Sequence, residues 1–241
     1  MGAMPNRGTA PGPELGTLRW PEVAQASRRL LVVPVGSLEQ HGPHLPMDTD
    51  TRIAVAVASR ACAGRDGVGL APAVAIGASG EHAGFPGTLS IGTEALVLVL
   101  TELGRHASLH WPSMLLVNGH GGNAEAITAA VRALRAEGRA CHAWQAGLPG
   151  SRLADPHAGR FETSLLLALA PDLVRLEKAV PGDTRPLAEI MPRLRAGGVR
   201  AVSPNGVLGD PAGASAAEGE ELLRQLAASL AARLDELLDS Y

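Results

Sequence analysis

Aromatic side chains are almost absent from this 241-residue chain, since Phe, Trp and Tyr together make up only 2% of it. Stacking of nucleic-acid bases or sugar rings on aromatic platforms is therefore not expected as its mode of recognition. The net charge is −3 at pH 7, and no cluster of basic residues interrupts the sequence. A general nucleic-acid-binding protein usually needs a basic face, so we expect no nucleic-acid partner.

Cysteine is scarce as well, because Cys62 and Cys141 are the only two in the chain. Two thiols cannot build a disulfide framework or a four-thiolate zinc site. Free thiols are typical of the reducing cytosol, and the polar N-terminal segment contains no apolar run of the kind found in secretory signals. No apolar run reaches the roughly 18 residues that span a membrane. We therefore expect a cytoplasmic protein with no membrane partner.

Hydrophobic residues make up 46% of the chain, which is enough to build a sizeable core. A length of 241 residues suits one large domain or two small ones. The first 13 residues are rich in Gly and Pro and predict a disordered N-terminal segment. We therefore expect residues 14–241 to form one domain.

Short apolar runs alternate with longer helical patterns along the chain. Strands are predicted at 28–36, 67–77, 112–119 and 139–147, and helices at 51–64, 93–111, 123–138, 162–174 and 216–241. Strands that are apolar on both faces and alternate with helices predict an α/β fold with a mostly parallel sheet covered on both sides. Residues 177–212 carry many Pro and Gly residues, and they are interpreted as a long loop or an insertion packed near the site.

Polar residues that can bind metal ions follow the predicted strands. They are Glu39, His41 and Asp50 after the first strand, Ser79, Glu81 and His82 after the second, His120 after the third, and His157 and Glu162 after the fourth. Ligands of parallel α/β sheets bind at the carboxyl ends of the strands, so these segments are expected to converge there. This convergence is the strongest functional indication in the sequence.

Imidazole and carboxylate ligands together suit zinc, manganese or iron. Five such ligands exceed what one catalytic zinc ion usually takes, and they suit two divalent ions about 3.5–4 Å apart with a bridging carboxylate. Asp50 is the candidate bridge. The alternatives are a solvated polar loop for Glu39 and His41, a tight glycine turn around His120, and a carboxylate favoured by the helix dipole for Glu162.

The remaining candidates can serve in other ways. His157 can carry a proton to the leaving nitrogen, or it can be another metal ligand. Glu81 and His82, with Ser79 beside them, can shape a substrate pocket, orient the metal ligands or simply pack in a loop. The other polar candidates are expected to be structural, namely His44, Asp48, His106, His110 and His142. Phosphate-binding loops, dinucleotide fingerprints, nucleophile elbows and H-E-x-x-H helices are all missing from the sequence.

Four segments, "GSLEQHGPHLPMDTDT", "EHAGFPGTLSIG", "NGHGGN" and "HAGRFETS", resemble the creatininase family of metal-dependent amidohydrolases. They occur in the family's order and cover about residues 30 to 170. The resemblance implies a three-layer α/β/α sandwich, two divalent ions and a homo-oligomer, commonly a hexamer. It also implies that Glu39, Asp50 and His120 hold one ion, that His41, Asp50 and a glutamate hold the other, and that His157 is catalytic.

The chain departs from creatininase proper at Gly122, where that enzyme has a glutamate. Glu162 is then the expected replacement, and creatinine becomes a doubtful substrate. The opening "ELGTLRW" and the segment around Glu39 are similar to a branch of peptidases within the family. That branch removes a C-terminal Val-Tyr dipeptide from a modified precursor peptide. The alternatives are hydrolysis of a small cyclic amide or formamide, and a metal-bearing structural or partner-binding protein.

Overall fold

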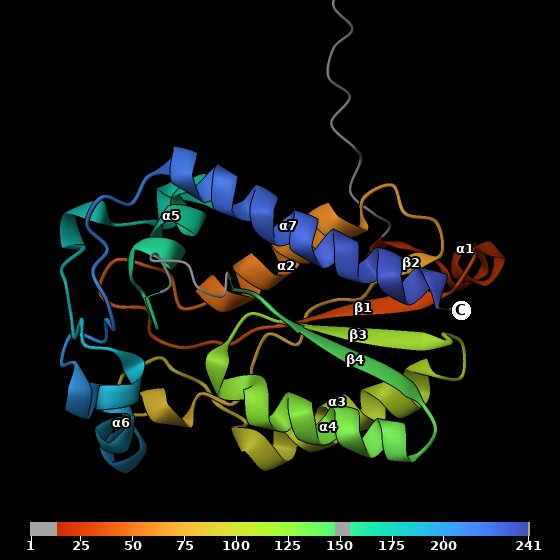
Figure 1. The fold of residues 1–241 in the computed structure, drawn as a ribbon, viewed down its shortest axis with the longest axis horizontal. Helices are drawn as coiled ribbons and strands as arrows, with labels where there is room; N and C mark the ends of the chain where they lie inside the picture. The colour runs from red at the N-terminus through yellow and green to blue at the C-terminus, as the bar shows by residue number, and fades with distance from the viewer. Residues whose placement is uncertain (1–13, 148–154, 241) are drawn as a thin grey trace, which may run out of the picture.

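Four parallel strands form the sheet at the centre of the computed structural model, which describes residues 14–147 and 155–240 (Figure 1). They are β1 (Leu30–Val35), β2 (Val68–Leu70), β3 (Ser113–Asn118) and β4 (Ala140–Gln145), in the spatial order β2-β1-β3-β4. The central pair runs in register from Leu30 opposite Ser113 to Val35 opposite Asn118. The predicted disordered segment 1–13 lies outside the described residues.

Helices cover both faces of this sheet, as the sequence predicts (Figure 1). One face packs against α2 (Thr49–Cys62), α5 (Arg160–Leu169) and α7 (Ala216–Asp239), and the other against α3 (Gly92–Ala107) and α4 (Ala124–Ala136). Side chains alternate between the faces of a strand, so Leu30 and Val32 enter one core while Leu31 and Val33 enter the other. The three-layer α/β/α architecture is confirmed.

Two predicted segments differ in detail. β2 is shorter than its apolar run: beyond Leu70, the backbone N–H groups of Ala71 and Val74 still donate to the Val32 and Pro34 carbonyls, but the pairing with β1 continues only as an isolated bridge between Val35 and Val74. The segment 177–212 is not simply a loop, since it contains α6 (Leu187–Val202). Pro192 and the left-handed Gly198, at φ 69°, interrupt that helix and hide its pattern in the sequence.

The remaining short elements connect these layers. They are α1 (Trp20–Gln25) and the 3-10 helices η1 (Leu15–Thr17), η2 (Gly80–His82), η3 (Gly121–Asn123), η4 (Pro171–Leu173) and η5 (Leu176–Lys178). Within the residues that the structure describes, no helix has the length and apolar character needed to cross a membrane.

The strand order creates a crevice at the carboxyl ends of β1 and β3. The chain leaves β1 towards α2 on one face of the sheet, and it leaves β3 towards α4 on the opposite face. The two connections therefore diverge between neighbouring strands. Such a point of divergence is where open α/β sheets bind their ligands.

The long helix α7 depends on its buried leucines for stability. Leu230 is completely buried against the sheet-facing core, so Leu230→Ala should lower the free energy of unfolding by about 2–5 kcal/mol, because it removes apolar contacts and leaves a cavity. Leu109, which is 67% exposed, provides the control, and Leu109→Ala should change stability by less than about 0.5 kcal/mol. Denaturant unfolding measures both, and equal stability of the two variants would contradict this packing.

Candidate metal centre

The segments that follow β1, β3 and β4 meet at this crevice. Glu39 and His41 lie in the loop after β1, Asp50 lies in the first turn of α2, and His120 directly follows β3. His157 and Glu162 come from the segment that leads into α5 and from its first turn. Their ligand atoms form three overlapping groups, namely Glu39–Asp50–His120, His41–His157–Glu162 and Glu39–His82–His157. The structure thus brings together all six residues predicted as metal ligands or as the catalytic histidine, but the group that contains His41 and Glu162 is completed by His157 and not by Asp50.

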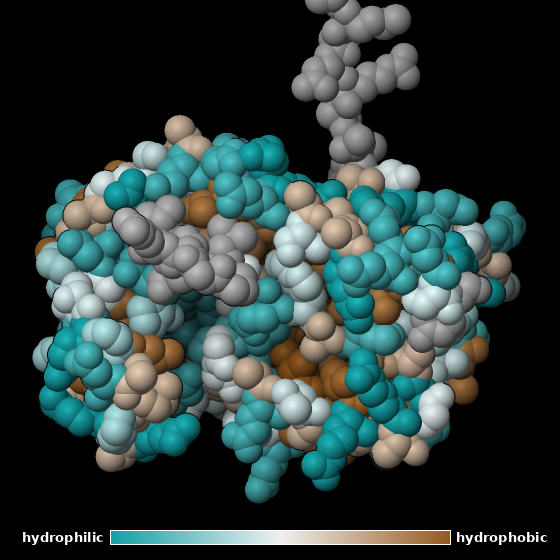
Figure 2. All heavy atoms as spheres, viewed as in Figure 1, coloured by the Kyte–Doolittle hydropathy of each residue, from teal (hydrophilic) through white to brown (hydrophobic). Residues whose placement is uncertain are grey.

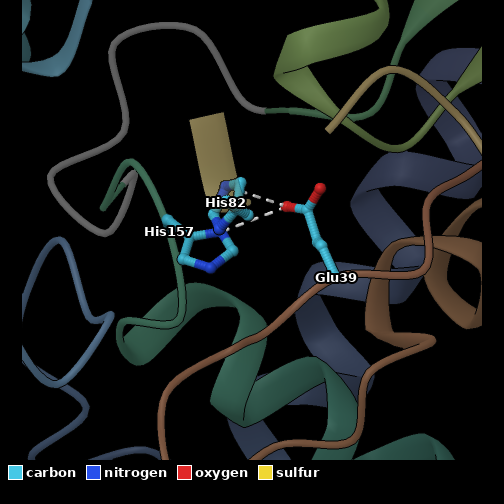
Figure 3. Close-up of side chains that lie close together, drawn as sticks. All are labelled: Glu39, His82 and His157. Carbon is cyan, nitrogen blue, oxygen red and sulfur yellow. Dashed lines mark ion pairs between the residues drawn. The ribbon is translucent and has the colours of Figure 1, made fainter. Parts of the chain in front are cut away.

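Glu39 is completely buried and faces three imidazole rings. Its Oε2 lies 3.1 Å from His120 Nε2, and its Oε1 lies 3.2 Å from His82 Nε2 and 3.8 Å from His157 Nδ1. Figure 3 shows the rings of His82 and His157 turned towards this carboxylate. Neither carboxylate oxygen has a hydrogen-bond partner among the described residues. Burying a charged carboxylate without hydrogen bonds costs free energy, because the group loses its hydration, and a bound cation would offset this cost.

Asp50 presents its two oxygens to different halves of the site. Oδ1 lies 3.1 Å from His41 Nε2, whereas Oδ2 lies 3.2 Å from His120 Nδ1. The Ser37 hydroxyl donates a hydrogen bond of 2.6 Å to Oδ2 and fixes the orientation of the carboxylate. This placement between two ligand groups is the one that a bridging carboxylate requires.

Glu162 completes the half of the site that contains His41. Its Oε2 lies 3.9 Å from His41 Nε2 and accepts a hydrogen bond of 2.6 Å from the backbone N–H of Ala158. Ala158 adopts φ 53°, a left-handed conformation that is unfavourable for a residue with a Cβ. The Glu162 carboxylate therefore helps to stabilise a strained turn directly after His157.

Backbone carbonyls fix the tautomers of two histidines. His41 Nδ1 lies 3.1 Å from the carbonyl oxygen of Glu39, and His120 Nε2 lies 3.1 Å from that of Ala78. When each of these nitrogens donates its proton to the carbonyl, the other ring nitrogen is left free. His41 Nε2 and His120 Nδ1 are then the metal-binding atoms, and both point towards Asp50.

Gln40 organises the other two histidines through its backbone carbonyl and its side-chain amide. His157 Nε2 lies 2.7 Å from the Gln40 backbone carbonyl oxygen, to which it donates its proton, so Nδ1 keeps a free lone pair. The Gln40 amide group then donates to His82 Nδ1 at 2.9 Å and to the Gly206 carbonyl at 3.0 Å. His82 consequently carries its proton on Nε2, which lies 3.2 Å from Glu39 Oε1 without forming a hydrogen bond to it. This arrangement supports an orienting role for His82 rather than that of a metal ligand.

The side chains that could bind metal in this site suit divalent cations. Three carboxylates and two imidazoles gather in an enclosed site, and the metal-binding atoms His41 Nε2 and His120 Nδ1 lie 3.1 and 3.2 Å from the nearest Asp50 oxygens. Two ligand atoms on one ion, each at about 2.1 Å, come about 3.0–3.4 Å apart in octahedral or tetrahedral geometry. No thiolate lies in the three groups, so the chemistry favours zinc, manganese or iron over metals that prefer sulfur.

Burial also shifts the acid–base behaviour of these groups. It raises the pKa of Glu39 and of Glu162 to about 7 each, because the charged carboxylates lose their hydration. Burial lowers the pKa of His41, but the neighbouring Asp50 carboxylate outweighs this effect and raises it to about 10. Burial and the nearby His41 hold the pKa of His157 well below its usual range, so His157 is neutral. Cations bound here would displace protons from the ligands.

A cavity of about 310 Å³ opens beside the metal-ligand cluster, and Figure 2 shows the surface hollowed next to the α6 region. Its polar wall contains Glu81, His82, His120 and His157. Of the residues predicted to bind substrate, Glu81 and His82 reach this wall, whereas Ser79 is fully buried and is not part of the lining.

The residues predicted to be structural lie outside the three metal-ligand groups. His44 is buried and hydrogen-bonds Thr163 Oγ1 at 2.9 Å, and Asp48 pairs with Arg52 at 2.7 Å. Gln40, in contrast, is not among the functional candidates that the sequence predicts. Its position between Glu39 and His41 in the same motif is the only signal in the sequence that could have identified it.

At Gly122, where the family resemblance implies that this chain departs from creatininase proper, the structure leaves no room for a side chain. A Cβ at this position would collide with Glu81 Oε1 and His120 Nε2 and would lie 2.5 Å from the Ala78 carbonyl oxygen. Glu81 Oε1, which lies 3.4 Å from His120 Nε2, fills part of this space. A carboxylate from a different segment therefore lies where the missing side chain would begin.

A parallel α/β/α sandwich with buried carboxylate and imidazole groups at its switch point defines a class of metal-dependent hydrolase. The sequence matches the family described as creatininase, creatinine amidohydrolase, over residues 16–234. The chain therefore belongs to the creatininase family and is a hydrolase that acts on amide bonds.

Individual relatives agree with this assignment. The chain is 56% identical over 211 residues to the mycofactocin precursor peptide peptidase of Mycolicibacterium smegmatis, covering 85% of this chain and 84% of the relative. It is 33% identical to the creatinine amidohydrolase of Pseudomonas putida, covering 74% and 80% of the two chains. A solved creatininase structure described as a manganese form superimposes with a TM-score of 0.76 at 30% identity, covering 93% of this chain and 98% of that one.

The crowding at Gly122 generates a test of the site. Gly122→Ala should lower the free energy of unfolding by about 1–3 kcal/mol and reduce the metal content, because the new methyl group displaces Glu81 and His120. Gly121→Ala is the matched control, since a Cβ at that position meets no atom within 4 Å. Thermal unfolding and elemental analysis of both variants measure the effect. If the Gly122 variant matched the Gly121 variant in stability and metal content, this description of the site would be wrong.

Proposed function

We propose that this chain is a peptidase that removes the C-terminal Val-Tyr dipeptide from the modified precursor peptide of mycofactocin. Support comes from the relative that is 56% identical and is named a mycofactocin precursor peptide peptidase. The space beside Gly122 is already filled by Glu81, which argues against the ligand arrangement of creatininase proper. The proposed substrate is therefore a peptide rather than creatinine.

The observation that carries the proposal is the position of Asp50 between two groups of potential ligands. We propose that Glu39, Asp50 and His120 hold one divalent ion and that His41, Asp50 and Glu162 hold a second, the ions being zinc, iron or manganese. Ions bound by these residues would supply a water molecule of lowered pKa and would polarise the scissile carbonyl. This chemistry acts on amides without a covalent intermediate, in agreement with the absence of a nucleophile elbow from the sequence.

We assign the proton transfer to His157. The attacking water adds its oxygen to the acyl carbon, and the departing nitrogen needs a proton as the C–N bond breaks. His157 is neutral, and its Nε2–H is held by the Gln40 carbonyl at 2.7 Å, so Nδ1 can accept the proton that the water loses. The same nitrogen then delivers that proton to the departing amine. His82 and Gln40 keep the ring and Glu39 in position.

The wider organisation is part of the proposal. We propose that residues 14–241 act as one metallohydrolase domain and that the protein works in the cytoplasm. The family resemblance implies a homo-oligomer, with a hexamer as the expected assembly, and neither nucleic acid nor membrane as a partner.

Cleavage of defined substrates tests this function. Metal-loaded protein should release Val-Tyr from the modified precursor peptide, as detected by mass spectrometry, and should leave creatinine and a formamidopyrimidine unchanged. Asp50→Ala should lose both the activity and most of the metal, because it removes a ligand from each half of the site. Hydrolysis of the small amides with no release of the dipeptide would favour the alternative amidohydrolase function. Tight metal binding without hydrolysis of any amide would favour a structural role.

The role of His157 has its own test. His157→Ala should retain the metal ions and lower kcat by about 10²–10⁴-fold, because the proton transfer is lost while the proposed ligands remain. His110→Ala, at an exposed position after α3, is the control and should keep normal turnover. Near-normal turnover of the His157 variant, or loss of its metal, would show that this histidine has another role.

A further inference from the structure

The cavity beside the metal-ligand cluster has a second wall of different character. It consists of apolar residues that come mainly from α6, namely Leu187, Met191, Leu194 and Val199, together with Leu208. One charged residue of α6, Arg195, belongs to the same wall. Leu187, Met191, Leu194 and Arg195 are spaced i, i+4, i+7 and i+8, so one face of the helix supplies them all. Among the described residues, the cavity therefore has a polar side next to the metal-ligand cluster, an apolar side, and one arginine in its lining.

α6 is fixed to the segment that carries His82. Gly198 adopts φ 69°, and a Cβ there would lie 2.6 Å from the Glu81 carbonyl oxygen. Arg200 donates a hydrogen bond of 2.6 Å to the Gly84 carbonyl, and its guanidinium lies 5.7 Å from the centre of the Phe85 ring. These contacts place the pocket-lining face of α6 at a defined position relative to the site.

The arginines of α6 differ in their partners. Arg193 donates to the Ala201 carbonyl at 2.7 Å, and Arg200 donates to Gly84, so both have structural roles. For Arg195, no hydrogen bond or ion pair links its guanidinium to any residue of the described ranges 14–147 and 155–240. An arginine in a pocket wall that has no such partner can offer its planar, charged donors to a ligand.

We propose that Arg195 binds the C-terminal carboxylate of the peptide substrate, while the apolar wall of α6 contacts the last two side chains. This inference rests on the proposed peptidase function and names how the site selects its substrate. A guanidinium and a carboxylate are complementary in charge and geometry. Leu187, Met191 and Leu194 offer an apolar surface of the kind that Val and Tyr side chains bury favourably.

The size of the cavity agrees with a short C-terminal segment. Two extended residues span about 7 Å, and a compact cavity of about 310 Å³ is about 8 Å across. It lies at the small end of the range of ligand pockets. Binding of the terminal carboxylate at Arg195 would therefore place an amide bond close to the chain end beside His157. Arg195 then determines specificity by fixing the distance between the chain end and the bond that is cut.

Binding of the free dipeptide to the metal-loaded enzyme tests this inference without requiring turnover. The two ligands are Val-Tyr as the free acid and Val-Tyr as the C-terminal carboxamide. The carboxamide removes the negative charge of the C-terminus and keeps nearly the same shape. By calorimetry, the wild-type protein should bind the acid about tenfold more tightly than the carboxamide. Arg195→Met should bind both with the weaker affinity, because the side chain keeps its length and loses its charge. Arg132→Met, at an exposed arginine of α4 that does not line this cavity, is the control and should retain the wild-type preference.

Cleavage of the modified precursor peptide, with its C-terminus as the free acid or as the carboxamide, separates the inference from the proposed function. Arg195→Met should raise KM for the acid about tenfold with kcat little changed. If the wild type cleaves both forms equally well, or if the Arg195 variant keeps the preference for the acid, carboxylate recognition by Arg195 is wrong while the peptidase function stands. If the wild type cleaves neither form, the peptidase function itself fails.

Discussion

The buried carboxylate of Glu39 is the constraint on which the rest of the site depends. It is completely buried and has no hydrogen bond from any described residue, although three imidazole rings stand around it. The Asp50 carboxylate lies next to His120, which Glu39 also faces, and next to His41, and Glu162 adds a third acidic group. An enclosed site with three carboxylates needs bound protons or metal cations to balance their negative charge. Backbone carbonyls accept the proton of one nitrogen of His41 and of His120, so the other nitrogen of each ring is free to bind a metal ion.

The fold explains how distant segments supply this charge. Parallel strands end at a common edge, and the connections after β1 and β3 leave towards opposite faces of the sheet. The loop after β1 can therefore turn inwards with Glu39 and His41, while His120 approaches from β3. Gln40 then ties the site to later parts of the chain, because its side-chain amide donates to the Gly206 carbonyl and its backbone carbonyl accepts from His157.

The sequence was sufficient to predict the three-layer fold and the metal-ligand candidates, because both follow from local patterns. Apolar runs with helices between them predict the sheet, and Glu39, His41 and His120 directly follow strands. The role of Gln40 could not be predicted, since its partners His82, His157 and Gly206 lie 42, 117 and 166 residues away. The helix α6 was also missed, because Pro192 and Gly198 resemble loop residues. The position of the Glu81 carboxylate next to Gly122 could not be predicted either, because it depends on packing between segments that are distant in the sequence.

The most direct test of this account is anomalous X-ray diffraction from crystals of the protein grown with zinc or manganese. The account predicts two anomalous peaks about 3.5–4 Å apart, with Asp50 between them, Glu39 and His120 at one peak, and His41 and Glu162 at the other. No anomalous peak among these five residues, with their side chains pointing into separate regions, would contradict it.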